Sequence, residues 1–360
     1  MQEDDVMTLN EENNEVVAKS AQPRRPRSGF LNILLLGIGL IVLLLIAFSG
    51  WIYISIFSGP GPMEMSDFHP FKSAEAKVRY LAFEDKMAKK WPIASEERTV
   101  QTSFGKTFMR ISGPVDAPPL VLLPGGGCNS LIWSTNIKAL SKEYRTYALD
   151  NIYDFGRSVY TRKMESGNDC AVWLDELFDT LSLGSSVRMI GYSYGGWVTS
   201  QYALHHPERL TRVVLIAPAY TILPITDEMI WSMVATLLPV RYFKQKAMYS
   251  VWKDLVELGK EGREIVDERV DYVQIAYSSF KFKMPVNPTV LSDSELQNIR
   301  VPLLYLVGAN ETMYSADSAI ARLRKVAPII ETELISGTGH DLMFTHTEIV
   351  DQRMLKFLKN

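Results

Sequence analysis

The sequence predicts an α/β protein built on a mostly parallel, doubly wound sheet, and two observations support this fold class. Short apolar runs of strand type alternate with longer runs of helical periodicity, as in a parallel sheet covered by helices on both faces. One of the apolar runs passes through a Gly-Tyr-Ser-Tyr-Gly turn at residues 191–195 and continues as a helix. A strand, a sharp turn and a helix in this order expose the central serine at the carboxyl edge of the sheet.

Composition narrows the classes of function. The chain of 360 residues has 47% hydrophobic side chains and a net charge of −3, so we expect no nucleic-acid partner. The five histidines have no metal-ligand spacing, and we predict neither a metal nor a cofactor. Cys128 and Cys170 are the only cysteines, which excludes a disulfide framework but leaves a single bond between them open. Nothing in the sequence predicts the oligomeric state.

The N-terminal part of the chain predicts a membrane anchor. Residues 1–29 are polar and contain prolines, which indicates a disordered tail. Residues 30–57 are almost entirely apolar and uncharged, and the run is longer than the about 20 residues that a transmembrane helix needs. Arginines precede the run, so we expect a cytoplasmic tail, a single-pass signal anchor in the cell membrane, and a folded domain outside the cytoplasm. Residues 58–71 are predicted to be a linker.

The folded domain is predicted over residues 72–360 and begins with a helix and a hairpin. Residues 73–90 have helical periodicity, and their apolar face is expected to pack on the body of the domain. That face consists of Ala76, Tyr80, Phe83 and Met87. Two β-rich runs then predict a hairpin over residues 98–112.

Strands and helices alternate through the rest of the domain. Further strands are predicted at residues 120–123, 145–149, 187–190, 213–216, 301–307 and 331–335. Helices are predicted around residues 133–140, at 169–181, from the serine turn towards His205, and at 316–326.

One interval departs from this alternation. Residues 219–300 contain no clear strand and are rich in methionine and aromatic residues. Because an unstructured loop of about 80 residues is improbable in a compact domain, we predict a helical cap over the carboxyl edge of the sheet. Some of its aromatic side chains are expected to line a pocket.

Three side chains provide the parts of a nucleophilic centre. Ser193 is the expected nucleophile, and glycines beside it leave room where backbone segments approach closely. His340 is the expected base, because it lies in a glycine-bracketed loop after the last strand. Glu311 follows the preceding strand, so a single crossover brings it to the same sheet edge, where it would orient the imidazole. The end of strand 213–216 carries only alanine and proline, which favours Glu311 as the acid.

An oxyanion formed at this centre needs backbone donors. The N–H of Tyr194 follows the nucleophile directly and is the first expected donor. Gly126, in the glycine-rich loop after strand 120–123, is the predicted second donor, since a glycine lets substrate approach its backbone.

From about residue 72 onwards, the chain resembles the α/β-hydrolase fold proteins that carry a helical cap. The matching motifs are Leu122-Leu123-Pro124-Gly125-Gly126, Leu149-Asp150 with Gly156-Arg157-Ser158, Gly191-Tyr192-Ser193-Tyr194-Gly195-Gly196, and Gly339-His340. The order nucleophile, acid, histidine is also that of the family. Pro124 stands where members often have histidine, and Glu311 where many have aspartate. The resemblance implies a structural role for Asp150 rather than a catalytic one.

The serine nucleophile implies acyl transfer, whereas epoxide hydrolases and haloalkane dehalogenases of this fold use an aspartate. The leading interpretation is therefore a membrane-anchored serine hydrolase, esterase or lipase-like, that acts on a small-molecule acyl substrate through a Ser-His-Glu triad. Two alternatives remain open. One is a peptidase or a carbon–carbon bond hydrolase, and the other is a ligand-binding sensor on a hydrolase scaffold.

Overall fold

The computed structural model describes residues 28–57, 65–281, 283 and 286–359, in two compact units, Met1–Gly59 and Pro60–Asn360. The first unit contains helix α1 (Ser28–Phe57). Among the described residues, no helix has the length and apolarity that crossing a membrane demands. Most of the predicted tail and the first half of the predicted linker lie outside the described residues.

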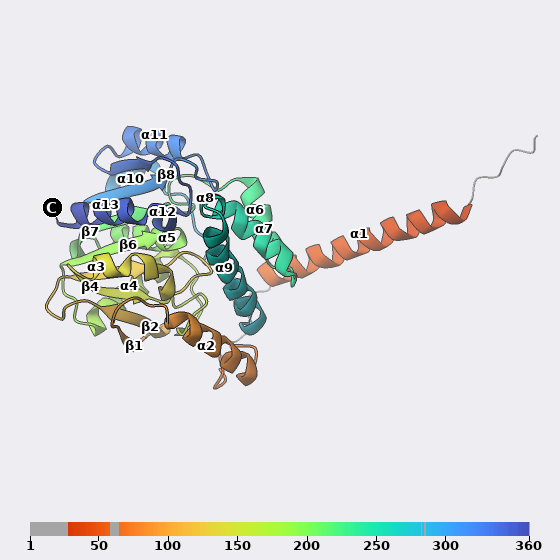
Figure 1. The fold of residues 1–360 in the computed structure, drawn as a ribbon, viewed down its shortest axis with the longest axis horizontal. Coiled ribbons are helices and arrows are strands. Elements are labelled where there is room, and N and C mark those ends of the chain that lie inside the picture. Colours follow the sequence, from red (N-terminus) through yellow and green to blue (C-terminus); the bar gives the residue numbers. More distant parts are fainter. Residues whose placement is uncertain (1–27, 58–64, 282, 284–285, 360) are drawn as a thin grey trace, which may run out of the picture. The chain divides into compact units, whose positions relative to one another are not determined.

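A nine-stranded sheet forms the centre of the second unit (Figure 1). The strand order is β1-β2-β4-β3-β6-β7-β8-β9, and the short β5 pairs with β2. All pairings from β4 to β9 are parallel, whereas those that involve β2 are antiparallel. The strands are β1 (Glu96–Thr102), β2 (Gly105–Ser112), β3 (Pro119–Leu123), β4 (Arg145–Leu149), β5 (Val159–Tyr160), β6 (Val187–Tyr192), β7 (Leu210–Ile216), β8 (Leu303–Gly308) and β9 (Glu331–Ile335). The predicted mostly parallel sheet is confirmed, and β5 is the strand that the sequence did not predict.

Helices cover both faces of this sheet and bury a hydrophobic core on each (Figure 1). The first face carries α4 (Gly167–Thr180), α5 (Tyr194–His205), α10 (Asp293–Asn298) and α11 (Ala316–Val326). The second face carries α3 (Ile137–Leu140), α12 (Leu342–Thr345) and α13 (Thr347–Lys359). The central strands are therefore covered on both sides, which explains why β3, β6, β7 and β8 are mostly apolar runs, whereas the edge strands β1 and β9 stay partly exposed.

The helix predicted around residues 133–140 is divided in two. The 3-10 helix η1 (Ser130–Thr135) is followed by Asn136 and then by the short α3. The side chain of Asn136 donates a hydrogen bond of 2.7 Å to Asp351 of α13. This contact between distant parts of the chain holds Asn136 at the break, which helical periodicity alone does not reveal.

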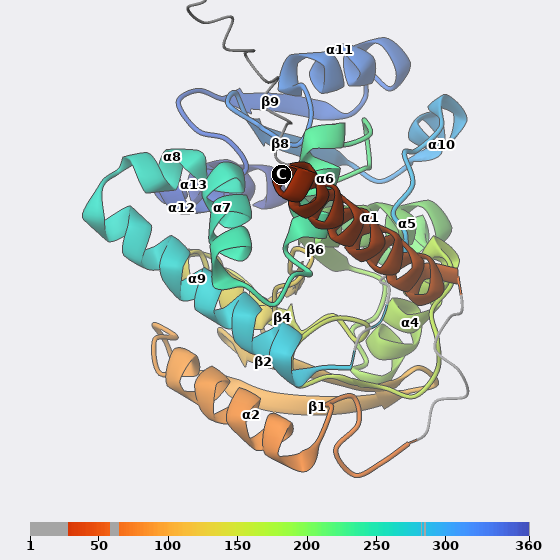
Figure 2. The same ribbon diagram turned by 90° about the vertical axis from the view of Figure 1, so that its right-hand side faces the viewer.

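The interval in which the sequence predicts a helical cap lies between β7 and β8. It contains α6 (Asp227–Ala235), α7 (Arg241–Val251), α8 (Lys253–Glu257) and α9 (Lys260–Ser279), followed by α10. The long helix α9 runs alongside α2 (Ala74–Ala88), as Figure 2 shows. The cap therefore packs on α2, which lies far from it in the sequence.

Helix α2 is joined to the cap and to the body of the domain. On its predicted inward face, Ala76 and Tyr80 are buried, and the Tyr80 hydroxyl lies 2.9 Å from the hydroxyl of Tyr272 on α9. On the same helix, Glu84 is fully buried and pairs with Arg157, 2.9 Å away, in the loop after β4. These contacts agree with the prediction that this helix packs on the folded domain.

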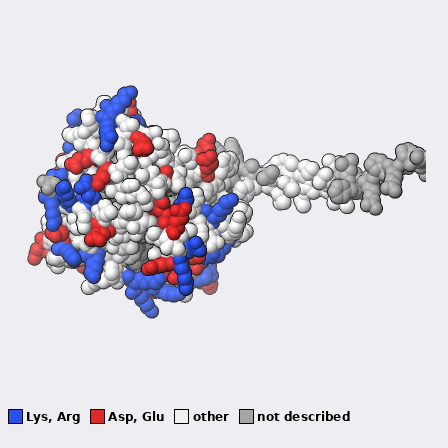
Figure 3. All heavy atoms as spheres, turned by 45° about the horizontal axis from the view of Figure 1, so that its top comes forward, with Lys and Arg blue, Asp and Glu red and all other residues white. Residues whose placement is uncertain are grey.

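Charges of both signs are interspersed over the face of the domain seen in Figure 3. This surface has no broad field of one sign, in keeping with the small net charge of −3.

Candidate active site

Ser193 lies at the sharp turn between β6 and α5, where the sequence predicts the nucleophile. Its backbone angles are φ 52° and ψ −118°, a conformation that a residue with a side chain adopts only under strain. Four backbone hydrogen bonds hold the turn. The Ser193 N–H donates to the Ile216 carbonyl of β7 at 2.9 Å, and the Ser193 carbonyl accepts from the N–H groups of Gly196 at 2.9 Å, Ala219 at 3.2 Å and Trp197 at 3.3 Å.

The glycines of the turn are required because neighbouring backbone leaves no room for a side chain, as the sequence predicts. A Cβ atom on Gly191 would lie 2.3 Å from the Gly195 carbonyl oxygen. One on Gly195 would lie 2.4 Å from the carbonyl oxygen of Leu123 in β3. Because both neighbours are backbone atoms, neither position accepts a larger residue without moving the turn.

Glu311 and His340 form a buried pair. Glu311 follows β8 and His340 follows β9, and the Glu311 Oε2 atom lies 2.8 Å from His340 Nδ1. The two side chains are 0% and 4% exposed, respectively. The other oxygen, Glu311 Oε1, accepts the N–H of Met313 at 2.9 Å. Since an ionised carboxylate only accepts hydrogen bonds, this arrangement puts a proton on Nδ1 and leaves Nε2 of the neutral ring as an acceptor.

The imidazole of His340 lies next to the nucleophile turn. The ring centroids of Tyr192 and His340 are 5.2 Å apart, and the Tyr192 hydroxyl donates to the His340 carbonyl at 2.9 Å. Tyr192 immediately precedes Ser193. Ser193 Oγ and the His340 ring, both among the described residues, do not form a hydrogen bond with each other. The structure thus pairs Glu311 with His340 and packs His340 against Tyr192, the residue before Ser193.

The glycine-rich loop after β3 lies against the same turn. A Cβ on Gly125 would be 3.2 Å from the Cβ of Ser193, and one on Gly126 would be 3.4 Å from the Cβ of Tyr194. The two predicted oxyanion donors, Gly126 and Tyr194, are therefore neighbours. The hydroxyl of Tyr194 points to the cap and donates to the Val286 carbonyl at 3.0 Å.

Asp150 has the structural role that the resemblance implies. It is fully buried, and its two oxygens accept the backbone N–H groups of Ser130 at 2.8 Å and Arg157 at 2.7 Å. Burial raises the pKa of Asp150, and these backbone donors oppose the rise.

The sequence did not predict two charged residues, Asp154 and Lys283, of which Asp154 contacts the glycine-rich loop after β3. Asp154 is 9% exposed and accepts the N–H of Gly127 at 2.9 Å. Lys283 lies with its ammonium nitrogen 5.0 Å from the ring centroid of Tyr153, and burial lowers the pKa of Lys283 to about 8, against the influence of Asp154. The only signal for Asp154 was a second aspartate shortly after a strand end, and the sequence offered none for Lys283.

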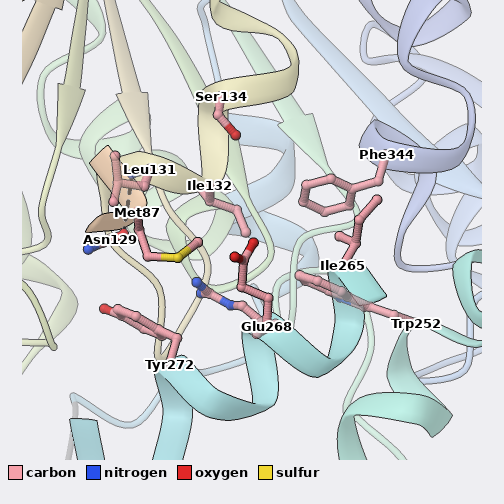
Figure 4. Close-up of a pocket in the computed structure, with 11 residues that line it drawn as sticks. Met87, Asn129, Leu131, Ile132, Ser134, Trp252, Ile265, Glu268, Tyr272 and Phe344 are labelled. Carbon is pink, nitrogen blue, oxygen red and sulfur yellow. Dashed lines mark hydrogen bonds between the residues drawn. The ribbon is translucent and has the colours of Figure 1, made fainter. Parts of the chain in front are cut away.

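A pocket beside α9 is lined by two of the cap aromatics, Trp252 and Tyr272 (Figure 4). Its other walls come from α2, from the segment after β3, and from Phe344. Ser193, Glu311 and His340 are not among its lining residues. It is therefore distinct from the pair described above.

The cysteines and acidic groups add no further centre. Cys128 and Cys170 are both free and buried, so the disulfide that the sequence left open does not form. Within the described parts of the chain, no group of three or more histidine, cysteine, aspartate or glutamate side chains could hold a metal ion.

Comparisons with known proteins identify the class to which this fold and site belong. Residues 118–240 match the family model described as the alpha/beta hydrolase fold. Carboxylesterase YbfK of Bacillus subtilis (strain 168) is 34% identical over 296 residues, which cover 82% of this chain and 98% of that relative. The chain belongs to the α/β-hydrolase family.

Two solved structures from Bacillus subtilis narrow the class further. Naproxen esterase (carboxylesterase NP) has a TM-score of 0.71 at 30% identity, covering 82% of this chain and 99% of that one. Carboxylesterase CesB (YbfK) has a TM-score of 0.71 at 31% identity, and the match covers 79% of this chain and 99% of that one. The protein is an esterase-type hydrolase whose relatives are carboxylesterases.

Proposed function

We propose that the protein hydrolyses carboxylic esters of small molecules through an acyl-enzyme on Ser193, with His340 as base and Glu311 as the acid that orients it. The observation that carries this proposal is the buried 2.8 Å hydrogen bond between Glu311 and His340 beside the strained serine turn. The Glu311 carboxylate contacts Nδ1 of the imidazole, and because both side chains are buried, water does not compete for that nitrogen.

The first half of the reaction forms the acyl-enzyme. Ser193 Oγ attacks the acyl carbon while His340 Nε2 takes the hydroxyl proton, and the carbonyl oxygen becomes an oxyanion. The N–H groups of Tyr194 and Gly126 stabilise that charge. When the intermediate collapses, the carbon–oxygen bond of the ester breaks and His340 returns its proton to the departing alkoxide.

The second half repeats the sequence with water. His340 takes a proton from water as the oxygen attacks the acyl carbon, and the bond to Ser193 Oγ breaks as Oγ recovers a proton from His340. Glu311 stabilises the imidazolium formed in each half without taking up a proton itself. Substrate contact is expected to bring Ser193 Oγ and Nε2 within hydrogen-bond reach, because such contacts are often longer in the free enzyme.

Labelling with a fluorophosphonate and turnover of p-nitrophenyl esters test the proposal together. We expect the wild-type chain to label on Ser193 and to release p-nitrophenol. Ser193→Ala and His340→Ala should each lower kcat by several orders of magnitude, and the double variant should lose little more because the two residues act as one unit. An unlabelled wild type without turnover would favour the sensor alternative, and full activity in Ser193→Ala would exclude the mechanism.

We also propose that residues 30–57 anchor the enzyme in the cell membrane with the hydrolase domain outside the cytoplasm. The support comes from the sequence: an uncharged apolar run of sufficient length, with arginines on its N-terminal side. Carbonate-resistant sedimentation with membranes and protease access on intact cells test it. Release by carbonate would contradict the anchor, and protection of the hydrolase domain would contradict the orientation.

A further inference from the structure

The loop of residues 124–128, called the oxyanion loop below, has little freedom to move without disturbing the nucleophile. Its Gly125 lies against Ser193, and its Gly126 lies against Tyr194. A Cβ atom added to Gly125 would be 3.2 Å from the Ser193 Cβ, and one added to Gly126 would be 3.4 Å from the Tyr194 Cβ. In the proposed mechanism, the Gly126 N–H must point at the oxyanion. A displacement of about 1 Å in a catalytic group can cost about 10²-fold in rate, so the shape of this loop matters for turnover.

Steric contacts do not fix the middle of the oxyanion loop. Gly127 has φ +65°, in the left-handed region, and a Cβ added there would meet nothing within 4 Å. Glycine in open space has access to many backbone conformations. Hydrogen bonds therefore set the conformation of Gly127. One is the turn bond from the Cys128 N–H to the Gly125 carbonyl at 3.1 Å, and the others are made by the N–H and carbonyl of Gly127 itself.

Side chains from two separate elements bind the N–H and the carbonyl of Gly127. The Gly127 N–H donates to Asp154 Oδ2 at 2.9 Å, and Asp154 lies in the loop after β4. The Gly127 carbonyl accepts from Arg269 Nη2 at 3.3 Å, and Arg269 lies on cap helix α9. Both polar groups of Gly127 are thus bound by charged side chains, and charge-assisted bonds of this kind are stronger than neutral ones.

Both side chains are themselves held in place. Asp154 is 9% exposed, and its second oxygen accepts the N–H of Phe155 at 2.7 Å. The guanidinium of Arg269 lies 4.5 Å from the ring centroid of Tyr272, which is in turn joined to Tyr80 of α2. Arg269 also lines the pocket in Figure 4, where the labelled Tyr272 comes from the same helix. Neither group is a mobile surface charge that meets Gly127 by chance.

We propose that Asp154 and Arg269 are positioning residues. Their hydrogen bonds to the N–H and the carbonyl of Gly127 hold the oxyanion loop against Ser193. Neither side chain touches the reacting atoms; each acts through the backbone of Gly127. Because Arg269 belongs to the cap, its hydrogen bond to Gly127 also couples the position of α9 to the oxyanion donors. This inference rests on the proposed esterase mechanism.

The experiment uses the full-length enzyme with Asp154→Ala and Arg269→Met, each measured for kcat, KM and inhibition by an aryl boronic acid. A boronic acid forms a tetrahedral adduct with the serine and so reports on the oxyanion donors. We expect kcat and boronate affinity to fall in parallel by about 10- to 100-fold, less than the 10²–10³ lost when a donor itself is removed. KM should stay within about twofold, because ground-state binding does not use these donors.

Matched variants separate positioning from folding. Arg188 donates to the Leu358 carbonyl at 3.0 Å and lies 5.4 Å from the Tyr144 ring centroid, so Arg188→Met loses the same kinds of contact far from the site. It should lose stability as Arg269→Met does and keep both kcat and boronate affinity. Asp154→Asn retains an acceptor oxygen and should recover part of the loss in Asp154→Ala.

The outcomes distinguish this inference from the proposed function. Unchanged kcat and boronate affinity in both Asp154→Ala and Arg269→Met would show that these residues do not position the oxyanion loop. A change confined to KM would show the same. If Asp154→Ala fails to fold, Asp154→Asn and Arg269→Met decide by the same two readouts. A wild-type enzyme that neither labels nor turns over esters would instead refute the proposed function.

Discussion

The hydroxyl of Tyr192 donates a hydrogen bond to the backbone carbonyl of His340 across 2.9 Å, although 148 residues separate the two in sequence. Tyr192 is 2% exposed and His340 is 3% exposed. The residue that precedes Ser193 therefore holds the loop that carries His340. Since water does not reach this contact, the carbonyl has no replacement donor when the hydroxyl is removed.

Replacing Tyr192 with phenylalanine should lower both turnover and stability. The ring remains against His340, but the loop carbonyl loses its donor, which costs about 1–2 kcal/mol of unfolding free energy. A slightly displaced imidazole should reduce kcat by about tenfold with little change in KM. Steady-state kinetics and urea unfolding measure the two effects.

Tyr202→Phe is the matched control for that variant. Tyr202 is fully buried and its hydroxyl donates to Asp175 at 3.0 Å, away from the site. It should lose similar stability and keep kcat. If Tyr192→Phe and Tyr202→Phe have the same kcat as the wild type, the Tyr192 hydroxyl has no role in positioning His340.

Glu311→Gln should lower kcat by about 10³–10⁴. Glu311 uses one oxygen for His340 and the other for the Met313 N–H, whereas glutamine has only one accepting oxygen. One of the two contacts is lost, and the neutral amide no longer stabilises an imidazolium. Asp317→Asn and Asp227→Asn serve as comparisons, since loss of activity there with near-full activity in Glu311→Gln would place the acid elsewhere.

The parts of the site that follow from local chain geometry were predictable from the sequence. The strained turn at Ser193 is encoded by its flanking strand, glycines and helix, all within a short segment. Glu311 and His340 follow adjacent parallel strands, so their meeting at one sheet edge is a consequence of topology. Parallel strands bring their carboxyl ends together whatever the details of packing.

Contacts that depend on side-chain direction across the fold were not predictable. Asp154 reaches Gly127 from another loop, and Arg269 reaches it from a cap helix 142 residues away in sequence. Periodicity says which residues share a face of a helix, but not which distant backbone group a polar tip will meet. The break at Asn136 has the same origin, because its partner Asp351 lies on the last helix.

Tyr194→Phe should alter substrate binding more than chemistry. The Tyr194 hydroxyl donates to the Val286 carbonyl of the cap segment at 3.0 Å, while its backbone N–H remains available to the oxyanion. Removing this hydrogen bond should change KM by about threefold or more across a series of ester chain lengths, and it should leave kcat within about twofold of the wild type. A fall in kcat at constant KM would mean that the hydroxyl supports the oxyanion donors instead.

Asp351→Asn should stabilise the protein at alkaline pH and remove part of its pH dependence. Asp351 is 7% exposed, and burial raises its pKa from 3.8 to about 7, opposed by the hydrogen bond from Asn136. The folded chain then keeps a proton on Asp351 up to about pH 7, whereas the unfolded chain releases it near its ordinary pKa. Between these two pH values unfolding releases a proton, so the free energy of unfolding falls as pH rises. This loss of stability is complete above about pH 7.

Asparagine keeps the oxygen that accepts from Asn136 but never ionises. Urea unfolding at pH 5 and pH 8 should therefore show the variant gaining on the wild type by roughly 2–3 kcal/mol between the two pH values. An equal difference between variant and wild type at both pH values would mean that Asp351 has its ordinary pKa in the folded protein.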